Sequence, residues 1–465
     1  MLSPEILKSL NSVLSTTGRV SSNTLSLVIN TDSRRIQKGE TFVALLGENF
    51  DGFNYIEQVL KFGAAVVIYS KAVRRAEVIN KIAENFPDVL FVETTDTLKF
   101  IQELATKHIR NWRAEKVDRK IVSITGSNGK TTHKEMLSYL LNSVFPEKVL
   151  STKGNLNNHI GVPLTIFRLE DFHEIAIIEM GMNHPGEITE LCEIVHPEHG
   201  IITNIGAAHI EFMHSIENIY QEKLSLYKAV LKNSNANGMF VVNADDEFLS
   251  KLQPSKGLTT FGEANGDIRL NIVDGKISFN FNDNQVLINN KNILEHHNLK
   301  NLAATAILAM KLFPEKWQEI VLAANNYQQP SMNRSQWVDN IFLDAYNANP
   351  SSMKASLNSF ISIVKGKNIS LDECYFVLGD MNELGAFSRE FHKEIALSLK
   401  QEGIKNVSFI GRFKDYYLEG FSDPTSAYLK KEDFEAEWKK IRSKYKFVFV
   451  KASRSLQLES LMSIV

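Results

Sequence analysis

The sequence predicts an α/β protein with three domains, each built around a sheet that is wholly or mostly parallel. Its 465 residues exceed what one typical core accommodates, so two to three domains are expected. Over much of the chain, short apolar runs alternate with helical patterns, which is typical of parallel sheets covered by helices. We place the domains at residues 1–95, 96–327 and 328–465.

The first block has short strand candidates, and the two later blocks alternate strands with helices. An amphipathic helix is predicted over 1–15, and another over 97–112 opens the second block. The predicted strands are 41–46, 64–69 and 89–93 in the first block; 121–125, 147–151, 175–180, 200–204 and 239–243 in the second; and 341–346, 374–380, 406–411 and 446–452 in the third. Alternating residues around Asp274 and Gly275 predict a hairpin. The third block resembles a small doubly wound domain.

Composition excludes several classes of protein. The net charge of −2 gives no sign of a nucleic-acid partner or of binding to an anionic membrane. Two cysteines, Cys192 and Cys374, lie far apart in the sequence, so we expect neither a disulfide framework nor a zinc site. No apolar run reaches the length of a membrane span, and the N-terminus lacks the pattern of an export signal. We therefore expect a cytoplasmic protein.

The most informative segment is IVSITGSNGKTT, residues 121–132, followed by a helical pattern. A strand, a glycine turn and a helix N-terminus in succession form a phosphate-binding loop. Its residues are Gly126, Ser127, Asn128, Gly129, Lys130, Thr131 and Thr132. In this interpretation Lys130 reaches the β/γ-phosphates and the Thr131 hydroxyl ligates Mg²⁺. The common loop has a glycine where Ile124 stands, so an ordinary turn with a solvated lysine is the alternative.

Three further residues are candidates for a site beside this loop. Glu179 ends an apolar strand, where a carboxylate either ligates Mg²⁺ or lies in solvent. His209 follows the strand 200–204, and a structural histidine is as well supported as a ligand. Lys223 lies on a helix, and its position alone favours a solvated surface lysine.

Loops rich in Asn and Gly supply further candidates. Asn155 and Asn157 lie in STKGNLNNHIGVP, which either contacts a polar ligand or simply connects two elements. Asp344, Asn347 and Asn349 follow a strand in DAYNANPSSM, and a turn ended by a proline is the simpler explanation. Arg334 is either a surface residue or one that neutralises phosphate charge.

Together these stretches resemble the Mur ligase family of ATP-dependent, amide-forming enzymes over nearly the whole chain. The family's loop has the same G-x-x-G-K-T-T spacing as GSNGKTT. Within the family, GNLNNHIGVP, EMGMNHPGEI, DAYNANPSSM, LGDMNELG and KASRS resemble motifs of the member that joins D-alanyl-D-alanine to UDP-N-acetylmuramoyl-tripeptide. TDSRRIQKGETFVAL followed by DGFNY resembles its UDP-substrate domain. The resemblance implies a UDP-substrate domain, a P-loop-type ATP-binding domain and a Rossmann-like domain, in that order.

The resemblance also assigns roles. Lys130 would hold the β/γ-phosphates; Thr131 and Glu179 would bind one Mg²⁺, and His209 the second. Lys223 matches a lysine that the family carbamylates with CO₂ into a metal ligand, which contradicts the surface interpretation. The nucleotide contacts would come from Asn301, facing adenine, Arg334 at the γ-phosphate, Asp344 at the ribose, and Asn347. The substrate contacts would be Ser33 and Arg34 for the uridine diphosphate, Asn155 and Asn157 for the acceptor chain, Asn349, and Lys451 and Arg454 in the cleft.

The implied activity is an ATP-dependent ligation in peptidoglycan precursor synthesis, by a monomer that needs ATP and two Mg²⁺ ions. Three positions depart from the family pattern: Glu295 and His296 replace Gly-Arg, and Phe53 replaces a histidine. Two alternatives remain. One is a Mur-type or folylpolyglutamate-type ligase that adds a single amino acid, and the other is a nucleotide-binding switch without ligase chemistry.

Overall fold

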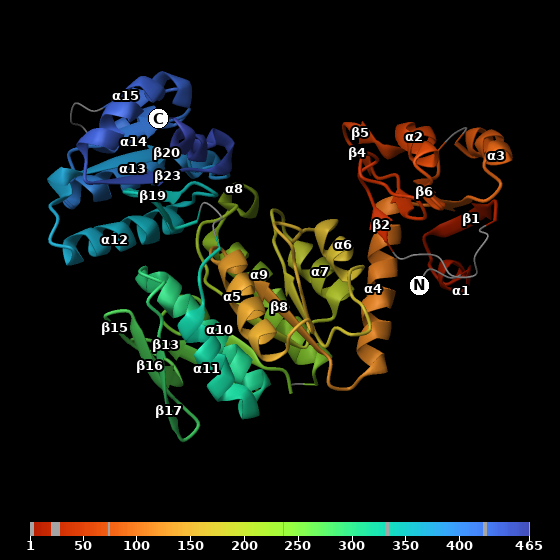
Figure 1. Cartoon of the computed structure of the whole chain (residues 1–465), viewed down its shortest axis with the longest axis horizontal. Helices are drawn as coiled ribbons and strands as arrows, with labels where there is room; N and C mark the ends of the chain where they lie inside the picture. Colours follow the sequence, from red (N-terminus) through yellow and green to blue (C-terminus); the bar gives the residue numbers. More distant parts are fainter. Residues whose placement is uncertain are drawn as a thin grey trace. The chain divides into compact units, whose positions relative to one another are not determined.

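The computed structural model describes residues 4–19, 28–72, 75–235, 237–330, 334–421 and 426–464 (Figure 1). The chain divides into two compact units. The first contains Met1–Ser123, Glu147–Met180 and Thr189–Glu198, and the second contains Ile124–Pro146, Gly181–Ile188 and His199–Val465. Each unit is described by itself below.

The N-terminal sheet of the first unit has the order β1-β7-β6-β3-β2. Its strands are β1 (Val13–Thr17), β2 (Ile29–Asn30), β3 (Thr41–Val43), β6 (Val66–Ser70) and β7 (Leu90–Thr94). All neighbours pair in parallel except β1, which runs antiparallel to β7. Side chains such as Phe42, Val59, Val67 and Phe91 form its buried core. Two further strands, β4 (Leu46–Gly47) and β5 (Phe50–Asp51), follow β3 in the chain and form a short antiparallel hairpin.

Helices accompany this sheet, and one prediction fails here. The helices are α1 (Pro4–Lys8), η1 (Gly52–Tyr55), α2 (Ile56–Lys61), α3 (Arg75–Asn85) and α4 (Thr97–Glu115). Asp96 begins α4, because its side chain accepts hydrogen bonds from the backbone N–H groups of Leu98 and Lys99. The helix predicted over 1–15 is wrong beyond Lys8: the chain forms β1 instead, since pairing with β7 satisfies its backbone.

A seven-stranded sheet has the order β14-β13-β12-β11-β8-β10-β9. Its strands are β8 (Lys120–Thr125), β9 (Val149–Ser151), β10 (Ile175–Glu179), β11 (His199–Ile202), β12 (Phe240–Asn243), β13 (Leu258–Gly262) and β14 (Ile268–Arg269). β9 pairs in parallel with β10, and β11 to β14 pair in parallel with one another. The helices that accompany it are α5 (Lys130–Val144), α6 (Gly161–Ile166), α7 (Glu187–Val195), α8 (Ile210–Met213), α9 (Ile216–Asn233), η2 (Leu249–Lys251), α10 (His296–Leu312), η3 (Pro314–Lys316) and α11 (Trp317–Asn326).

The predicted hairpin is confirmed and belongs to a three-stranded antiparallel sheet. This sheet contains β15 (Asn271–Val273), β16 (Lys276–Phe281) and β17 (Asn284–Asn289). Asp274 and Gly275 both have positive φ, 48° and 74°, as a two-residue hairpin turn requires. The sheet lies beside α11 in the second unit (Figure 1).

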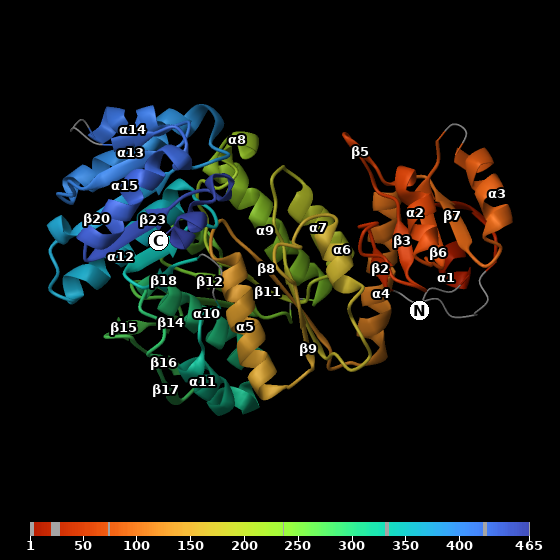
Figure 2. The same cartoon turned by 45° about the horizontal axis from the view of Figure 1, so that its top comes forward.

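The C-terminal sheet has the order β18-β19-β23-β20-β21-β22. Its strands are β18 (Gln336–Val338), β19 (Ile341–Asp344), β20 (Cys374–Gly379), β21 (Val407–Ile410), β22 (Ser426–Tyr428) and β23 (Phe447–Lys451). All pairs are parallel except β18 with β19. Helices surround it (Figure 2): α12 (Pro350–Gly366), η4 (Leu371–Glu373), η5 (Gly385–Phe387), α13 (Ser388–Gln401), α14 (Lys414–Phe421), α15 (Lys431–Lys444), η6 (Arg454–Leu456) and η7 (Leu458–Ser463).

This topology places polar residues at the carboxyl ends of parallel strands, where open α/β sheets bind ligands. Asp344 ends β19 directly opposite Lys451, which ends β23. The α/β class with mostly parallel sheets is thus confirmed, whereas the three domain boundaries stay a prediction. Every helix in the part of the chain that the structure describes is too short or too polar to cross a lipid bilayer.

Candidate active site

The predicted phosphate loop connects β8 to α5 in the second unit. Gly126 has a φ of 151°, and a Cβ on it would lie only 1.8 Å from the Thr203 hydroxyl, so any side chain there is excluded. Gly129 is the residue before α5 and has a left-handed φ of 76°. The Lys130 ammonium donates to the Gly126 carbonyl at 2.8 Å, inside the loop. These contacts favour a phosphate-binding loop over an ordinary turn with a solvated lysine.

A buried histidine supports the same loop. The His133 ring Nδ1 lies 2.9 Å from the Gly129 carbonyl, so this nitrogen carries the proton and donates. Burial lowers the pKa of His133 to about 4, and the ring is therefore neutral at neutral pH. Sequence reasoning missed His133, because a histidine on a helix gives no signal of burial.

Two distant segments are hydrogen-bonded to the loop. The Asn128 backbone N–H donates to the Asn204 side chain at 2.9 Å, and the Ser127 hydroxyl donates to the Gly206 carbonyl at 2.9 Å. The Asn128 side chain also accepts from the Asn349 amide at 2.7 Å and donates to the Ser351 hydroxyl at 2.8 Å. The predicted candidate Asn349 therefore lies at the phosphate loop, although it is more than 200 residues away in sequence.

Lys223 lies on α9 and is buried, exposing 1% of its surface. The surface interpretation that its helix position favoured is therefore wrong. Burial, and next the positive charge of Lys130, hold the pKa of Lys223 well below its usual range. The neighbouring Glu222 accepts the backbone N–H groups of Gly186 at 2.8 Å and of Ile188 at 2.7 Å, so this carboxylate fixes the start of α7. The site therefore contains a buried primary amine, with a lowered pKa, in the electrostatic neighbourhood of the phosphate-loop lysine.

His209 lies just before α8 and contacts a residue that sequence reasoning did not select. Its Nδ1 is 2.5 Å from Oε2 of Glu383, in the LGDMNELG motif. The contact with His209 is the main reason that the pKa of Glu383 is lowered, and Lys130 adds to the effect. His209, Glu383, Lys130 and Lys223 therefore share one electrostatic neighbourhood in the second unit.

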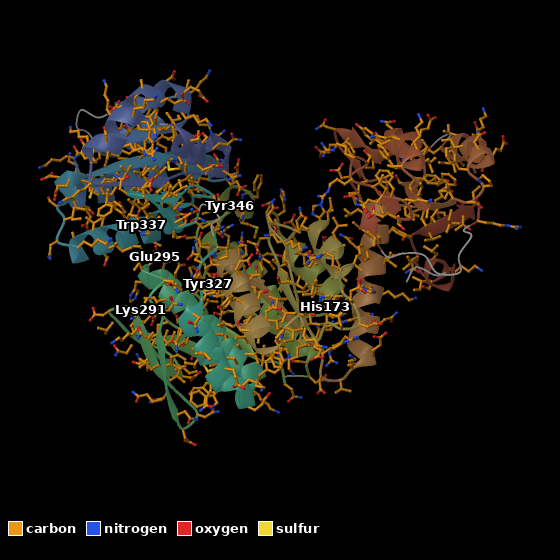
Figure 3. All side chains as sticks on the ribbon, in the orientation of Figure 1. His173, Lys291, Glu295, Tyr327, Trp337 and Tyr346 are labelled. Carbon is orange, nitrogen blue, oxygen red and sulfur yellow. The ribbon has the colours of Figure 1, made fainter. Side chains whose placement is uncertain are left out.

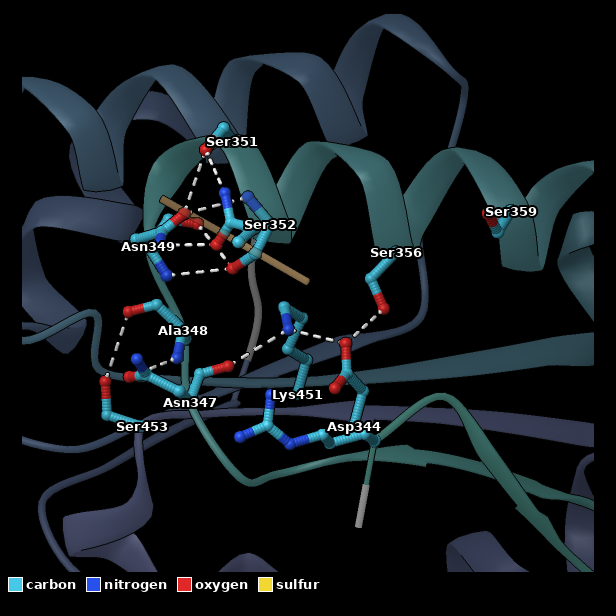
Figure 4. Close-up of polar contacts among 12 residues, drawn as sticks. Asp344, Asn347, Ala348, Asn349, Ser351, Ser352, Ser356, Ser359, Lys451 and Ser453 are labelled. Carbon is cyan, nitrogen blue, oxygen red and sulfur yellow. Dashed lines mark hydrogen bonds and ion pairs between the residues drawn. The ribbon is translucent and has the colours of Figure 1, made fainter. Parts of the chain in front are cut away.

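A buried ion pair lies at the end of β19 (Figure 4). The Lys451 ammonium is 2.5 Å from the Asp344 carboxylate and also donates to the Asn347 carbonyl at 3.1 Å. The Ser356 hydroxyl donates to Asp344 at 2.7 Å. Burial alone would raise the pKa of Asp344, but Lys451 and Ser356 lower it overall. The pair fixes the loop that follows β19; the predicted contacts of Asp344 with ribose and of Lys451 with substrate stay predictions.

An asparagine begins the next helix. The Asn349 side chain accepts the backbone N–H of Ser352 at 2.9 Å, and the Ser352 hydroxyl lies 3.0 Å from the Asn349 backbone N–H. This reciprocal capping box, together with Pro350 at the first helical position, fixes the start of α12. Figure 4 shows Asn347, Asn349 and the Asp344–Lys451 pair along one short stretch.

Two predicted arginines contact one aromatic ring. The Arg334 guanidinium lies 3.9 Å from the centroid of the Tyr346 ring, and that of Arg454 lies 5.7 Å away. Arg454 also pairs with Glu459 at 2.7 Å. Sequence reasoning missed Tyr346, labelled in Figure 3. Its ring face attracts cations, so it holds Arg334 close to the loop that carries Asn347.

The predicted adenine-side residue, Asn301, lies on α10, where its amide donates to Asn298 at 3.2 Å. Its Nδ2 would be 3.7 Å from a Cβ on Gly129, so Asn301 lies beside the phosphate loop. Of the departures from the family pattern, Glu295 is buried (Figure 3), which raises its pKa. His296 pairs with Glu263 at 2.9 Å. Glu295 is the residue before α10 and His296 is its first residue, and the Glu295 side chain makes no capping hydrogen bond.

Five predicted residues belong to the first unit. Glu179, at the end of β10, is buried and accepts a hydrogen bond from the Asn157 amide at 2.7 Å, so this structure brings two of them together. Arg34 pairs with Asp32 at 2.8 Å beside Ser33. Asn155 lies in the loop before α6. The roles assigned to these residues stay predictions.

Phe53, the third position that departs from the family pattern, packs against an arginine. The Arg75 guanidinium lies 4.6 Å from the centroid of its ring and pairs with Asp51 at 2.5 Å. Phe53 therefore packs against a cation. This contact uses the face of the aromatic ring and does not need the ring nitrogens of a histidine.

Known proteins match this chain over most of its length. Three profiles match: "Mur ligase family, catalytic domain" at residues 28–108, "Mur ligase middle domain" at 124–309, and "Mur ligase, glutamate ligase domain" at 333–435. A relative from Bacillus subtilis strain 168, a UDP-N-acetylmuramoyl-tripeptide–D-alanyl-D-alanine ligase, is 30% identical over 93% of this chain and 92% of its own length. The chain belongs to the Mur ligase family.

Other ligases of this family also match most of the chain. A ligase of the same name from Synechocystis is 32% identical over 82% of this chain and 78% of its own length. The crystal structure of MurF from Acinetobacter baumannii has a TM-score of 0.79 and 26% identity, covering 94% of this chain and 92% of that one. MurF from Thermotoga maritima in complex with ADP has a TM-score of 0.77 and 25% identity, covering 95% and 97%. The predicted family and three-domain α/β architecture are thus confirmed.

Proposed function

We propose that this chain is an ATP-dependent ligase that joins D-alanyl-D-alanine to UDP-N-acetylmuramoyl-tripeptide in peptidoglycan precursor synthesis. Relatives of that name match it over nine-tenths of its length. The observation that carries the proposal is the phosphate loop with the buried Lys223, whose pKa is lowered, and the Asp344–Lys451 loop in the same unit. A nucleotide-binding switch without ligase chemistry has no need for a buried lysine beside its phosphate-loop lysine.

The chemistry follows from the poor reactivity of a carboxylate. An oxygen of the tripeptide's terminal carboxylate attacks the γ-phosphorus of ATP, the bond to the β-phosphate oxygen breaks, and ADP leaves. The amine nitrogen of D-alanyl-D-alanine then attacks the acyl-phosphate carbon and loses a proton, and inorganic phosphate leaves as the amide forms. Lys130 and Arg334 offset charge on the transferring phosphoryl group in this proposal.

The residues assigned to the Mg²⁺ that such a reaction uses supply a hydroxyl, a carboxylate and an imidazole, all of which can bind metal ions. Thr131 lies in the first turn of α5 and His209 lies in the same unit, and we assign Glu179 to the same role from its motif. Bound Mg²⁺ would neutralise phosphate charge. No group of three His, Cys, Asp or Glu side chains forms a ready metal site within the described residues. A carbamate on Lys223 would supply oxygen ligands, which Mg²⁺ prefers, and a neutral amine is the form that reacts with CO₂.

A coupled assay tests the proposal. Purified protein receives UDP-N-acetylmuramoyl-tripeptide, ATP, Mg²⁺ and either D-alanyl-D-alanine or single amino acids, and mass spectrometry detects the product. We expect phosphate release and a product heavier by the dipeptide only with D-alanyl-D-alanine. A product with a single amino acid would favour the other ligase type, and ATP hydrolysis without any amide product would contradict the proposal. The monomeric state and the cytoplasmic location stay predictions.

A further inference from the structure

The contact between His209 and Glu383 joins two distant parts of the chain at the proposed site. His209 follows β11 and Glu383 follows β20, and their side chains approach to 2.5 Å between Nδ1 and Oε2. A backbone hydrogen bond also joins the two loops, because the N–H of Glu211 donates to the Glu383 carbonyl at 3.2 Å. Figures 1 and 2 both show α8 beside the C-terminal part of the second unit.

Backbone conformation holds both residues in place. His209 and Glu383 each have a φ of 60°, in the left-handed region that side-chain-bearing residues seldom adopt. Gly385 has a φ of 52°, and a Cβ on it would lie 2.9 Å from the Glu211 side chain. Such conformations persist where the surrounding structure fixes them, and they concentrate at functional sites. The approach of the two loops is thus built into the chain and involves more than two flexible side chains.

A carboxylate at Nδ1 has a defined effect on an imidazole. It favours the tautomer with the proton on Nδ1, which leaves the lone pair on Nε2 for a metal ion. Histidines that bind metal commonly contact a carboxylate through the other ring nitrogen, and this partner orients the ring and increases its basicity. Lys223 and Lys130 belong to the same neighbourhood, so the imidazole lies among the groups that the ligase reaction needs.

We infer that Glu383 is a positioning residue that orients His209 for metal binding during ligation. The inference rests on the proposed function. It gives the LGDMNELG motif a specific role: a carboxylate from the C-terminal part of the chain completes the surroundings of a metal ligand on the central part. Metal affinity then depends on the contact between these parts.

Metal binding provides the first test. Mn²⁺ binding, measured by electron paramagnetic resonance with a non-hydrolysable ATP analogue present, is compared between wild type and Glu383→Gln. We expect metal affinity to fall about tenfold, with the affinity for the analogue in EDTA unchanged. The matched control is Glu394→Gln, which removes an exposed carboxylate paired with Lys354 at 2.6 Å elsewhere in the C-terminal part; it should bind Mn²⁺ like wild type.

A second readout needs no metal. In protein with ¹⁵N-labelled histidine, His209 is assigned by comparison with His209→Gln, and its ring shifts report the tautomer. The Nδ1-protonated form should dominate in wild type and decline in Glu383→Gln but not in Glu394→Gln. Equal or tighter Mn²⁺ binding by Glu383→Gln, or an unchanged tautomer, would overturn the inference alone. Wild-type protein that binds no metal–nucleotide would overturn the proposed function and this inference with it.

Discussion

Two lysines, Lys223 and Lys451, are buried to the same degree but lie in opposite environments. Each exposes 1% of its surface. Lys451 ends β23 with the Asp344 carboxylate at 2.5 Å, whereas the described residues place no carboxylate within ion-pair distance of Lys223. Lys223 instead experiences the positive charge of Lys130, which adds to the effect of burial on its pKa. The two lysines are equally buried, so what distinguishes them is the charged group beside each one: a carboxylate at Lys451 and a second lysine at Lys223.

The largest effect should come from removing the Lys223 amine. Lys223→Ala should lower the ligation rate on the order of a thousandfold, because the site loses the group that is proposed to become an anionic ligand. Lys228→Ala on the exposed face of the same helix is the control and should retain wild-type activity. Steady-state phosphate release measures both, and acetate or formate should restore part of the lost rate. Undiminished ligation by the folded Lys223→Ala protein would contradict the proposed role.

The same substitution at both lysines separates their roles in stability. Lys451→Met leaves the buried Asp344 carboxylate without its cation and should cost about 3–5 kcal/mol of unfolding free energy. Lys223→Met removes an amine that lacks a carboxylate and should cost less than about 1 kcal/mol. Urea denaturation followed by circular dichroism measures both. Equal losses of unfolding free energy in the two variants would contradict the claim that only Lys451 has a stabilising carboxylate partner.

Lys130 links the phosphate loop to the buried amine. Lys130→Ala should lower kcat by about a hundredfold or more, because it removes a cation from the transferring phosphoryl group. It should also raise the pKa of Lys223, since a like charge is removed. Lys148→Ala, a half-exposed lysine paired with Glu174, is the control for kcat. Near wild-type turnover of the folded Lys130→Ala protein would refute the role.

His392 is a buried base in the C-terminal part of the chain, and it offers a smaller test through the pH dependence of stability. Its Nε2 accepts the Met381 backbone N–H at 3.0 Å, and burial lowers its pKa to about 4. Between pH 6.5 and 4 the unfolded chain binds a proton that the folded protein does not, so stability falls as the pH falls through this window. His392→Gln should reduce the difference in unfolding free energy between pH 7 and pH 5 by about 2 kcal/mol. The control is His214→Asn, at an exposed histidine, which should leave that difference unchanged. An unchanged difference in His392→Gln as well would contradict the lowered pKa of His392.

The sequence predicted the features that are contiguous in the chain. The phosphate loop, the hairpin at Asp274 and Gly275, and the mostly parallel sheets follow from local patterns of glycine and apolar residues. The helix expected over 1–15 was wrong beyond Lys8, because the pairing of β1 with β7 is tertiary and leaves no local pattern.

The candidate site was predictable only where a motif preserved it. Helical position indicated a solvated Lys223, and only the family resemblance indicated otherwise. The Asp344–Lys451 pair depends on β19 and β23 being neighbours, which requires the strand order. Glu383 and Tyr346 have partners that no spacing rule connects, so their roles became visible only in the fold.

The most direct test of the account is the chemical state of Lys223. Protein equilibrated with ¹³C-labelled bicarbonate is examined by ¹³C NMR, with Lys223→Ala and Lys451→Met as comparisons. A carbamate resonance should be present in wild type and in folded Lys451→Met and absent from Lys223→Ala, because the lowered pKa of Lys223 favours the uncharged amine that reacts with CO₂. A fully active wild-type preparation that shows no carbamate, or a resonance that persists in Lys223→Ala, would contradict the account.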